Sequence, residues 1–184
     1  MQYKVREYPL FSACGLNCGL CPRYYTAGES RCPGCAGEGF SDVHPLCGML
    51  SCCQRKGIEY CFECGEFPCK KYDSWGDSDS FITHRNYLGD MEKARKTGIE
   101  AYKAELNAKV KVLEELLNNY NDGRRKSFYC LAVNLLDLAD LESVMEKIRN
   151  EISPQAALKE KAMTAVRLLG AMADEKGISL KMRK

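Results

Sequence analysis

Apolar positions recur at helical spacing only in the second half of the chain. Residues 99–121 carry one apolar stripe in steps of three and four, formed by Ile99, Tyr102, Leu106, Val110, Leu113, Leu117 and Tyr120. Steps of this size place side chains on one face of an α-helix, so we expect one long helix here. A weaker pattern predicts an earlier helix over 82–96, broken near Gly89.

Capping residues predict where the later helices begin and end. Ser127 is a good N-cap for the helix after the long one, and Asp140 can cap a third. Ser153-Pro154 offers a cap followed by proline at the first helical position, which opens a last helix. Gly177 then ends that helix. The second half of the chain is therefore predicted to be a helical bundle.

The first 80 residues follow a different pattern, with few large aliphatic residues and most of the Gly and Pro. Eleven of the twelve cysteines lie between positions 14 and 69. A segment this small buries too little apolar surface to fold on packing alone, so it needs cross-links. We predict a mainly α protein with a small, irregular, metal-stapled Cys-rich module over 1–72. A polar connector over 73–82 and an α-helical domain over 83–184 follow it.

The cysteine spacing indicates metal binding. Three CxxC pairs are present: Cys18 with Cys21, Cys32 with Cys35, and Cys61 with Cys64. Four thiolates arranged around one ion form structural zinc sites. Two plausible quartets are Cys18, Cys21, Cys32 and Cys35, and Cys47, Cys52, Cys61 and Cys64. Three cysteines of the module remain outside them, Cys14, Cys53 and Cys69, so the partition among metal sites stays open.

Two other kinds of cross-link compete with zinc. Disulfides need an oxidising compartment, and the N-terminus leads into no apolar signal segment, so we expect a cytoplasmic protein with free thiols. An iron–sulfur cluster is the stronger alternative. Cys14-x3-Cys18-x2-Cys21 is an all-thiolate run followed by Pro22, loosely like ferredoxin spacing. The expected cofactor is zinc, as two ions, with an iron–sulfur cluster as the alternative.

The cysteine motifs also carry a resemblance to a known family. The matching segments are ACGLNCGLCPRY at 13–24, CPGC at 32–35, Cys47-x4-Cys52, and KGIEYCFECGEFPC at 56–69. Their order and spacing resemble an uncharacterised prokaryotic Cys-rich family, domain of unknown function 3795. The resemblance implies a zinc-binding module and supplies no established activity. By position it matches Cys14, Cys18, Cys21, Cys32, Cys35, Cys47, Cys52, Cys61, Cys64 and Cys69. Cys53 falls outside the pattern and is expected to be an extra thiol.

Charge and composition narrow the partners and the function. A net charge of +2 gives no reason to expect a nucleic-acid partner, and no apolar run is long enough for a membrane span. His44 and His84 are isolated, and no catalytic constellation is visible. We therefore expect a zinc-binding protein with structural metal sites and a working surface for a protein or small-ligand partner. An iron–sulfur redox or electron-transfer protein is the alternative, and an enzyme is less favoured.

Overall fold

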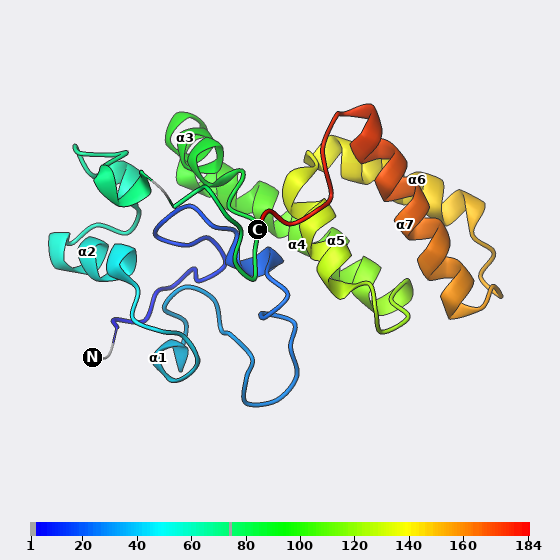
Figure 1. The fold of residues 1–184 in the computed structure, drawn as a ribbon, viewed down its shortest axis with the longest axis horizontal. Coiled ribbons are helices and arrows are strands. Elements are labelled where there is room, and N and C mark those ends of the chain that lie inside the picture. The colour runs from blue at the N-terminus through cyan, green and yellow to red at the C-terminus, as the bar shows by residue number, and fades with distance from the viewer. Residues whose placement is uncertain (1–2, 74) are drawn as a thin grey trace. The chain divides into compact units, whose positions relative to one another are not determined.

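The computed structural model describes residues 3–73 and 75–184 (Figure 1). Seven α-helices and no β-strand occur in these residues, so the predicted mainly α fold is confirmed. The helices are α1 (Phe40–Val43), α2 (Gly48–Lys56), α3 (Tyr87–Thr97), α4 (Ile99–Asn119), α5 (Lys126–Leu135), α6 (Leu138–Glu151) and α7 (Leu158–Glu175). Three 3-10 turns interrupt the Cys-rich part, η1 (Cys18–Leu20), η2 (Cys61–Glu63) and η3 (Lys70–Tyr72). No helix within the described ranges combines the length and apolarity needed to cross a bilayer.

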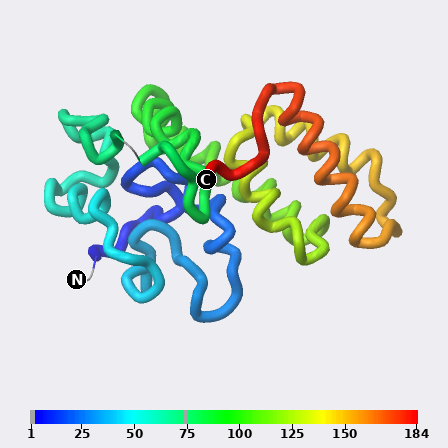
Figure 2. Tube along the Cα trace, viewed as in Figure 1, coloured from blue at the N-terminus to red at the C-terminus, as the bar shows by residue number. Residues whose placement is uncertain are grey.

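The described chain divides into two compact units. Unit 1 comprises residues 3–106 with 183–184, and unit 2 comprises residues 107–182. The path can be followed in Figure 2, where the colour runs from blue at the N-terminus to red at the C-terminus. The boundary between the units falls within α4. These units are defined by the contacts within them and need not be domains. The domain boundaries expected from the sequence, after residues 72 and 82, therefore stay a prediction.

Unit 2 is a helical bundle in which α7 packs against α5 and α6. Its core consists of fully buried aliphatic side chains, including Leu113, Leu116, Leu136, Leu141, Ile148 and Leu169. The buried Tyr129 hydroxyl donates to the Tyr120 carbonyl oxygen at 2.6 Å, which joins α5 to the segment after α4. Cys130 is buried beside it on α5, as expected for a small core residue.

Unit 1 is organised around aromatic side chains as well as cysteines. The Phe11 ring lies 5.4 Å from the Tyr60 ring and 4.5 Å from the Tyr102 ring, measured between centroids. The Tyr102 hydroxyl donates to Asn17 Oδ1 at 2.9 Å, and Asn17 Nδ2 donates to Asp90 at 2.9 Å. Because Asp90 lies on α3 and Tyr102 on α4, these contacts pack both helices onto the Cys-rich segment.

Two helices begin at positions other than the expected ones, for reasons visible in the turns before them. The expected helix over 82–96 begins at Tyr87 instead and runs unbroken through Gly89. Asp79 Oδ1 accepts hydrogen bonds from the Thr83 hydroxyl and the His84 N–H, which holds the preceding residues in a turn. The last helix begins at Leu158, because Ser153 closes a separate turn with the Ala156 N–H.

Two predicted caps are also displaced. The N-cap of α5 is Arg125 and that of α6 is Asp137, so Ser127 and Asp140 lie inside the first turns of their helices. Asn121 Oδ1 accepts the Arg125 N–H at 3.1 Å, which fixes the loop early enough for α5 to start at the next residue. The long helix itself matches its predicted range closely, from Ile99 to Asn119.

Candidate metal centre

Eleven thiols of unit 1 line two neighbouring cavities, whose walls share Met49 and Lys71. The larger cavity has a volume of about 600 Å³, and its cysteines are Cys14, Cys18, Cys21, Cys32, Cys35 and Cys47. The smaller cavity has a volume of about 80 Å³, and its cysteines are Cys52, Cys53, Cys61, Cys64 and Cys69. All twelve cysteines of the chain lie in the described ranges and are free thiols. The fold therefore gathers every cysteine of the Cys-rich segment at one of two places.

Two of the CxxC pairs have the same local geometry. Cys18 opens η1 and Cys61 opens η2, and each turn closes when the N–H of the second cysteine reaches the carbonyl oxygen of the first. These N···O distances are 3.1 Å at Cys21 and 3.0 Å at Cys64. The second cysteines also share an extended backbone, with φ/ψ of −84°/134° and −80°/132°. One repeated turn thus places a thiol pair on each cavity.

The third CxxC pair is held by the segment that precedes the first cysteine. The Cys35 N–H donates to the Pro9 carbonyl oxygen at 2.9 Å. Gly34 has a φ of +88°, and a Cβ added there would lie 2.6 Å from the same Pro9 oxygen. Only glycine fits this close approach, so the Cys32–Cys35 turn depends on it.

Helix α2 separates the cysteines of the second predicted quartet. Cys47 precedes α2 and lines the larger cavity, whereas Cys52 on α2 lines the smaller one. Cys69, which lay outside both quartets, joins the smaller cavity. Cys53 lies there too, with its sulfur 3.4 Å from the sulfur of Cys61. The grouping in space therefore differs from the grouping that sequence order suggests.

The segment that forms these cavities has relatives. Residues 10–74 match the family described as Protein of unknown function (DUF3795). The resemblance expected from the cysteine motifs is confirmed for this DUF3795 segment, which contains all eleven clustered cysteines. Comparison with curated proteins and with solved structures found no match.

The donor chemistry of the DUF3795 segment fits a thiophilic metal, and its sulfurs are spread along the cavity walls. In the described ranges, which hold every Cys and His of the chain, no three Cys, His, Asp or Glu side chains are arranged to hold a metal ion. Thiolates are the ligands that zinc and iron–sulfur centres take in proteins. Metal binding at either cavity would therefore draw the thiols closer together.

A buried arginine lies beside Cys35, one of the thiols that line the larger cavity. The Arg6 side chain is 3% exposed; its Nε donates to Glu59 at 2.5 Å and its Nη1 to the Phe11 carbonyl oxygen at 2.8 Å. Its Nη2 is buried without a hydrogen-bond partner. Burial raises the pKa of the neighbouring Cys35 thiol, and the Arg6 charge opposes that effect. Because an unpaired buried donor is costly, a thiolate at Cys35 would compensate it.

The two cavities give their thiols different acidities. Burial raises the pKa of Cys14, Cys18 and Cys21 in the larger cavity. In the smaller cavity, a hydrogen bond from the Cys53 thiol lowers the pKa of Cys61 to about 7, against the effect of burial and with help from two nearby lysines. The same hydrogen bond and burial raise the pKa of Cys53, so the smaller cavity contains one thiol with a raised pKa beside one with a lowered pKa.

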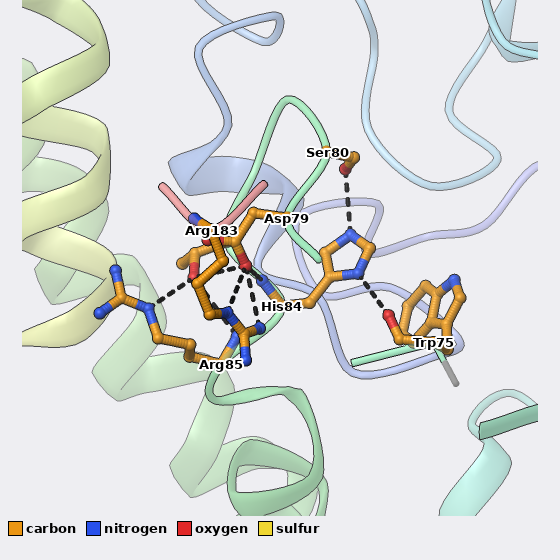
Figure 3. Close-up of polar contacts among 7 residues, drawn as sticks. Trp75, Asp79, Ser80, His84, Arg85 and Arg183 are labelled. Carbon is orange, nitrogen blue, oxygen red and sulfur yellow. Dashed lines mark hydrogen bonds and ion pairs between the residues drawn. The ribbon is translucent and has the colours of Figure 1, made fainter. Parts of the chain in front are cut away.

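The polar connector contributes to the site, which the sequence did not indicate. His84, expected to be isolated, is buried and lines the larger cavity. Its Nδ1 is 2.9 Å from the Trp75 carbonyl oxygen and its Nε2 is 3.0 Å from Ser80 Oγ (Figure 3). His44 also lines this cavity but is exposed. The sequence feature that could have pointed to His84 is the run of Asp and Ser residues over 73–80 that precedes it.

Proposed function

We propose that this chain is a zinc-binding protein whose metal is held by thiolates and has a structural role. One observation carries the proposal: the eleven clustered cysteines are free and line two cavities of a single unit. The first 72 residues of unit 1 form only short helices and turns. A segment of this size buries little apolar surface, so a bound metal would add stability that side-chain packing alone does not supply.

The smaller cavity is the better zinc site of the two. Its volume of about 80 Å³, enclosed by five thiols, has room for a single ion rather than for a large centre. Cys61 and Cys64 form a knuckle turn there, and Cys52 and Cys69 complete four thiolates. Cys53 would remain a buried neighbour of this zinc knuckle. Four thiolates close the coordination sphere and leave no position for substrate, which is the arrangement of a structural site.

The proposal also implies a compartment and a partner. Thiolate centres of this kind persist where cysteines stay reduced, so we place the protein in the cytoplasm. A structural metal leaves the working surface elsewhere, and its partner would be a protein or a small ligand. Exposed Leu46 and Phe81 at the larger cavity are the apolar side chains in the Cys-rich unit best suited to such contact.

Elemental analysis of the purified protein tests the zinc proposal. The wild-type chain should contain zinc, and Cys64→Ser should lose about one zinc per chain, because removing one of four thiolates opens and weakens a structural site. Cys130→Ser provides the matched control, since Cys130 lies in the core of unit 2 away from both cavities. Its zinc content should equal that of the wild type.

Three results would refute the zinc proposal. One is a wild-type chain without bound zinc after purification in zinc-containing medium. The second is Cys64→Ser protein with the wild-type zinc content. The third is a set of disulfides joining the clustered cysteines in freshly isolated protein. Circular dichroism of each variant verifies that its helices are formed before its metal content is compared.

A further inference from the structure

The two thiol-lined cavities differ in size far more than in cysteine content. The larger has about 600 Å³ and six cysteines, whereas the smaller has about 80 Å³ and five. In a closed zinc site each sulfur lies about 2.3 Å from the ion, so four thiolates occupy little space. The larger cavity therefore has room for a polynuclear centre, in which several metal ions share the thiolates.

Several cysteines of the larger cavity pack against one buried cluster. That cluster contains Cys35, and Cys18, Cys32 and Cys47 pack against it. In a four-iron, four-sulfide cluster, four cysteines hold the cluster together, so its ligands lie around the cluster rather than at a single ion.

Local sequence supplies three of these ligands in one stretch. Cys14, Cys18 and Cys21 follow each other closely around η1, and Pro22 comes next. Three closely spaced cysteines and a trailing proline are typical of cluster-binding runs. The Ser12 hydroxyl lies 3.0 Å from the sulfur of Cys14, and hydrogen bonds to sulfur are one means by which proteins tune such clusters.

The charge of the cavity wall suits an anionic centre. Its lining includes Arg23 and Lys71 but no Asp or Glu. Arg6, which is ion-paired with Glu59, lies behind this wall beside Cys35, with its Nη2 lacking a hydrogen-bond partner. Four thiolates around a four-iron cluster leave about two negative charges, which these cations would offset. A four-thiolate zinc has the same net charge, so cavity size rather than charge separates the two centres.

Much of the remaining wall is apolar. Apolar lining residues include Leu16, Phe40, Met49, Trp75 and Ile82. Both ring nitrogens of His84 are engaged, one by Ser80 and one by the Trp75 carbonyl, so His84 is part of the wall and is not free as a ligand (Figure 3). The apolar residues around a metal centre influence its properties.

We propose that the larger cavity binds a four-iron, four-sulfide cluster through four of its six cysteines, with Cys18 among the ligands. The chain then holds two different centres, a cluster in the larger cavity and zinc in the smaller. The cluster inference adds to the proposed zinc site and does not depend on it.

Purification without oxygen tests the cluster. Wild-type protein prepared anaerobically, or reconstituted with ferrous iron and sulfide, should contain about four iron and four sulfide per chain and absorb near about 400 nm. Cys18→Ser should lose this iron and the visible absorbance while keeping its zinc. Cys64→Ser should show the reverse pattern, losing zinc and keeping iron, which makes each variant the control for the other.

The outcomes separate the two proposals. Colourless anaerobic protein with two zinc ions and no iron after reconstitution would overturn the cluster and leave the zinc site standing. Iron retained in Cys18→Ser would also overturn the assignment. A brown protein that lacks zinc would support the cluster and refute the zinc site. Comparable helical circular dichroism in both variants shows that a lost metal does not reflect a misfolded chain.

Discussion

Asp79 is a carboxylate of unit 1 held by several hydrogen bonds and an ion pair. Its side chain is fully buried and accepts the Arg183 N–H at 2.8 Å and the His84 N–H at 2.9 Å (Figure 3). The Arg183 guanidinium lies 3.0 Å from the carboxylate. Burial alone would raise the pKa of Asp79, but these hydrogen bonds and this charge outweigh it and lower the pKa.

The lowered pKa of Asp79 predicts a dependence of stability on pH. A carboxylate with a depressed folded pKa contributes stability that is present above its unfolded pKa of about 4 and is lost as pH falls through the folded value. The free energy of unfolding should therefore fall below about pH 4, and Asp79→Asn should weaken that fall. Urea unfolding at several pH values measures it.

The control for this experiment is Asp42→Asn, because Asp42 is exposed on α1. In Asp42→Asn the free energy of unfolding should fall with decreasing pH as steeply as in the wild type. Any loss of metal in acid affects both variants equally and therefore cancels when they are compared. Asp79→Asn should also lower stability at neutral pH by about 1–3 kcal/mol, since hydrogen bonds to a charged acceptor are lost. An unchanged pH slope in Asp79→Asn would contradict the assignment.

Sequence reasoning selected the residues of the site better than their grouping. Cysteine spacing selected ten of the eleven cysteines that line the two cavities, all but Cys53, and metal binding by these cysteines stays a prediction. It could not place Cys47 apart from Cys52, because that depends on the path of α2. Nothing in the sequence shows that Arg6, a charged residue near the N-terminus, is buried beside Cys35.

At the scale of elements, the knuckle turns depend on glycine in ways that can be measured. Gly34 and Gly28 both have positive φ, +88° and +77°, but only Gly34 has a neighbour, the Pro9 oxygen, in the path of a Cβ. Gly28→Ala should cost about 1 kcal/mol for backbone strain alone. Gly34→Ala should cost about 2–5 kcal/mol, because strain and overpacking add. Urea unfolding of the metal-loaded proteins gives both values.

The same two variants distinguish backbone strain from disruption of the metal site proposed at the larger cavity. Gly34→Ala should also weaken metal retention at the larger cavity, because the Cys32–Cys35 turn must shift. Gly28→Ala should leave the metal content at the wild-type level. Equal destabilisation by the two substitutions would mean that the close approach to Pro9 is unimportant.

Helices with a sustained apolar stripe were predictable, and their starts were not. The stripe over 99–121 predicts α4 to within a few residues, because burial repeats over several turns. Helix starts depend on single turns closed by side chains. The hydrogen bond from the His84 N–H to Asp79 keeps the residues before α3 in a turn. The hydrogen bond from the Arg125 N–H to Asn121 fixes the loop so that α5 begins at Lys126, before Ser127. Such hydrogen bonds connect residues that no periodic pattern relates.

At the scale of the molecule, metal removal should affect the two units unequally. Unit 2 has an aliphatic core without clustered cysteines, whereas the cysteines of the DUF3795 segment line the two cavities proposed to bind metal. After verified metal removal by a chelator, amide hydrogen exchange should accelerate throughout residues 10–72 and persist at its slow rate in α5, α6 and α7.

Helix α4 refines this expectation, because it belongs to both units. Tyr102 in its first turns is hydrogen-bonded to Asn17 of the Cys-rich segment. Exchange should therefore accelerate in the part of α4 before residue 107 and less in the part after it. Protection of residues 10–72 that survives complete demetallation would show that metal does not stabilise this segment.

The hydrogen bonds of Asp79 to Arg183 have a consequence for unit 2 that requires no contact between the units. They join positions that are 104 residues apart in the sequence, and the residues of unit 2 fall within that interval of the chain. When unit 2 unfolds with these bonds intact, it is a closed loop rather than a free tail, and a closed loop has fewer conformations to gain. The bundle is thereby stabilised through the entropy of its unfolded state, by a carboxylate that it does not contain.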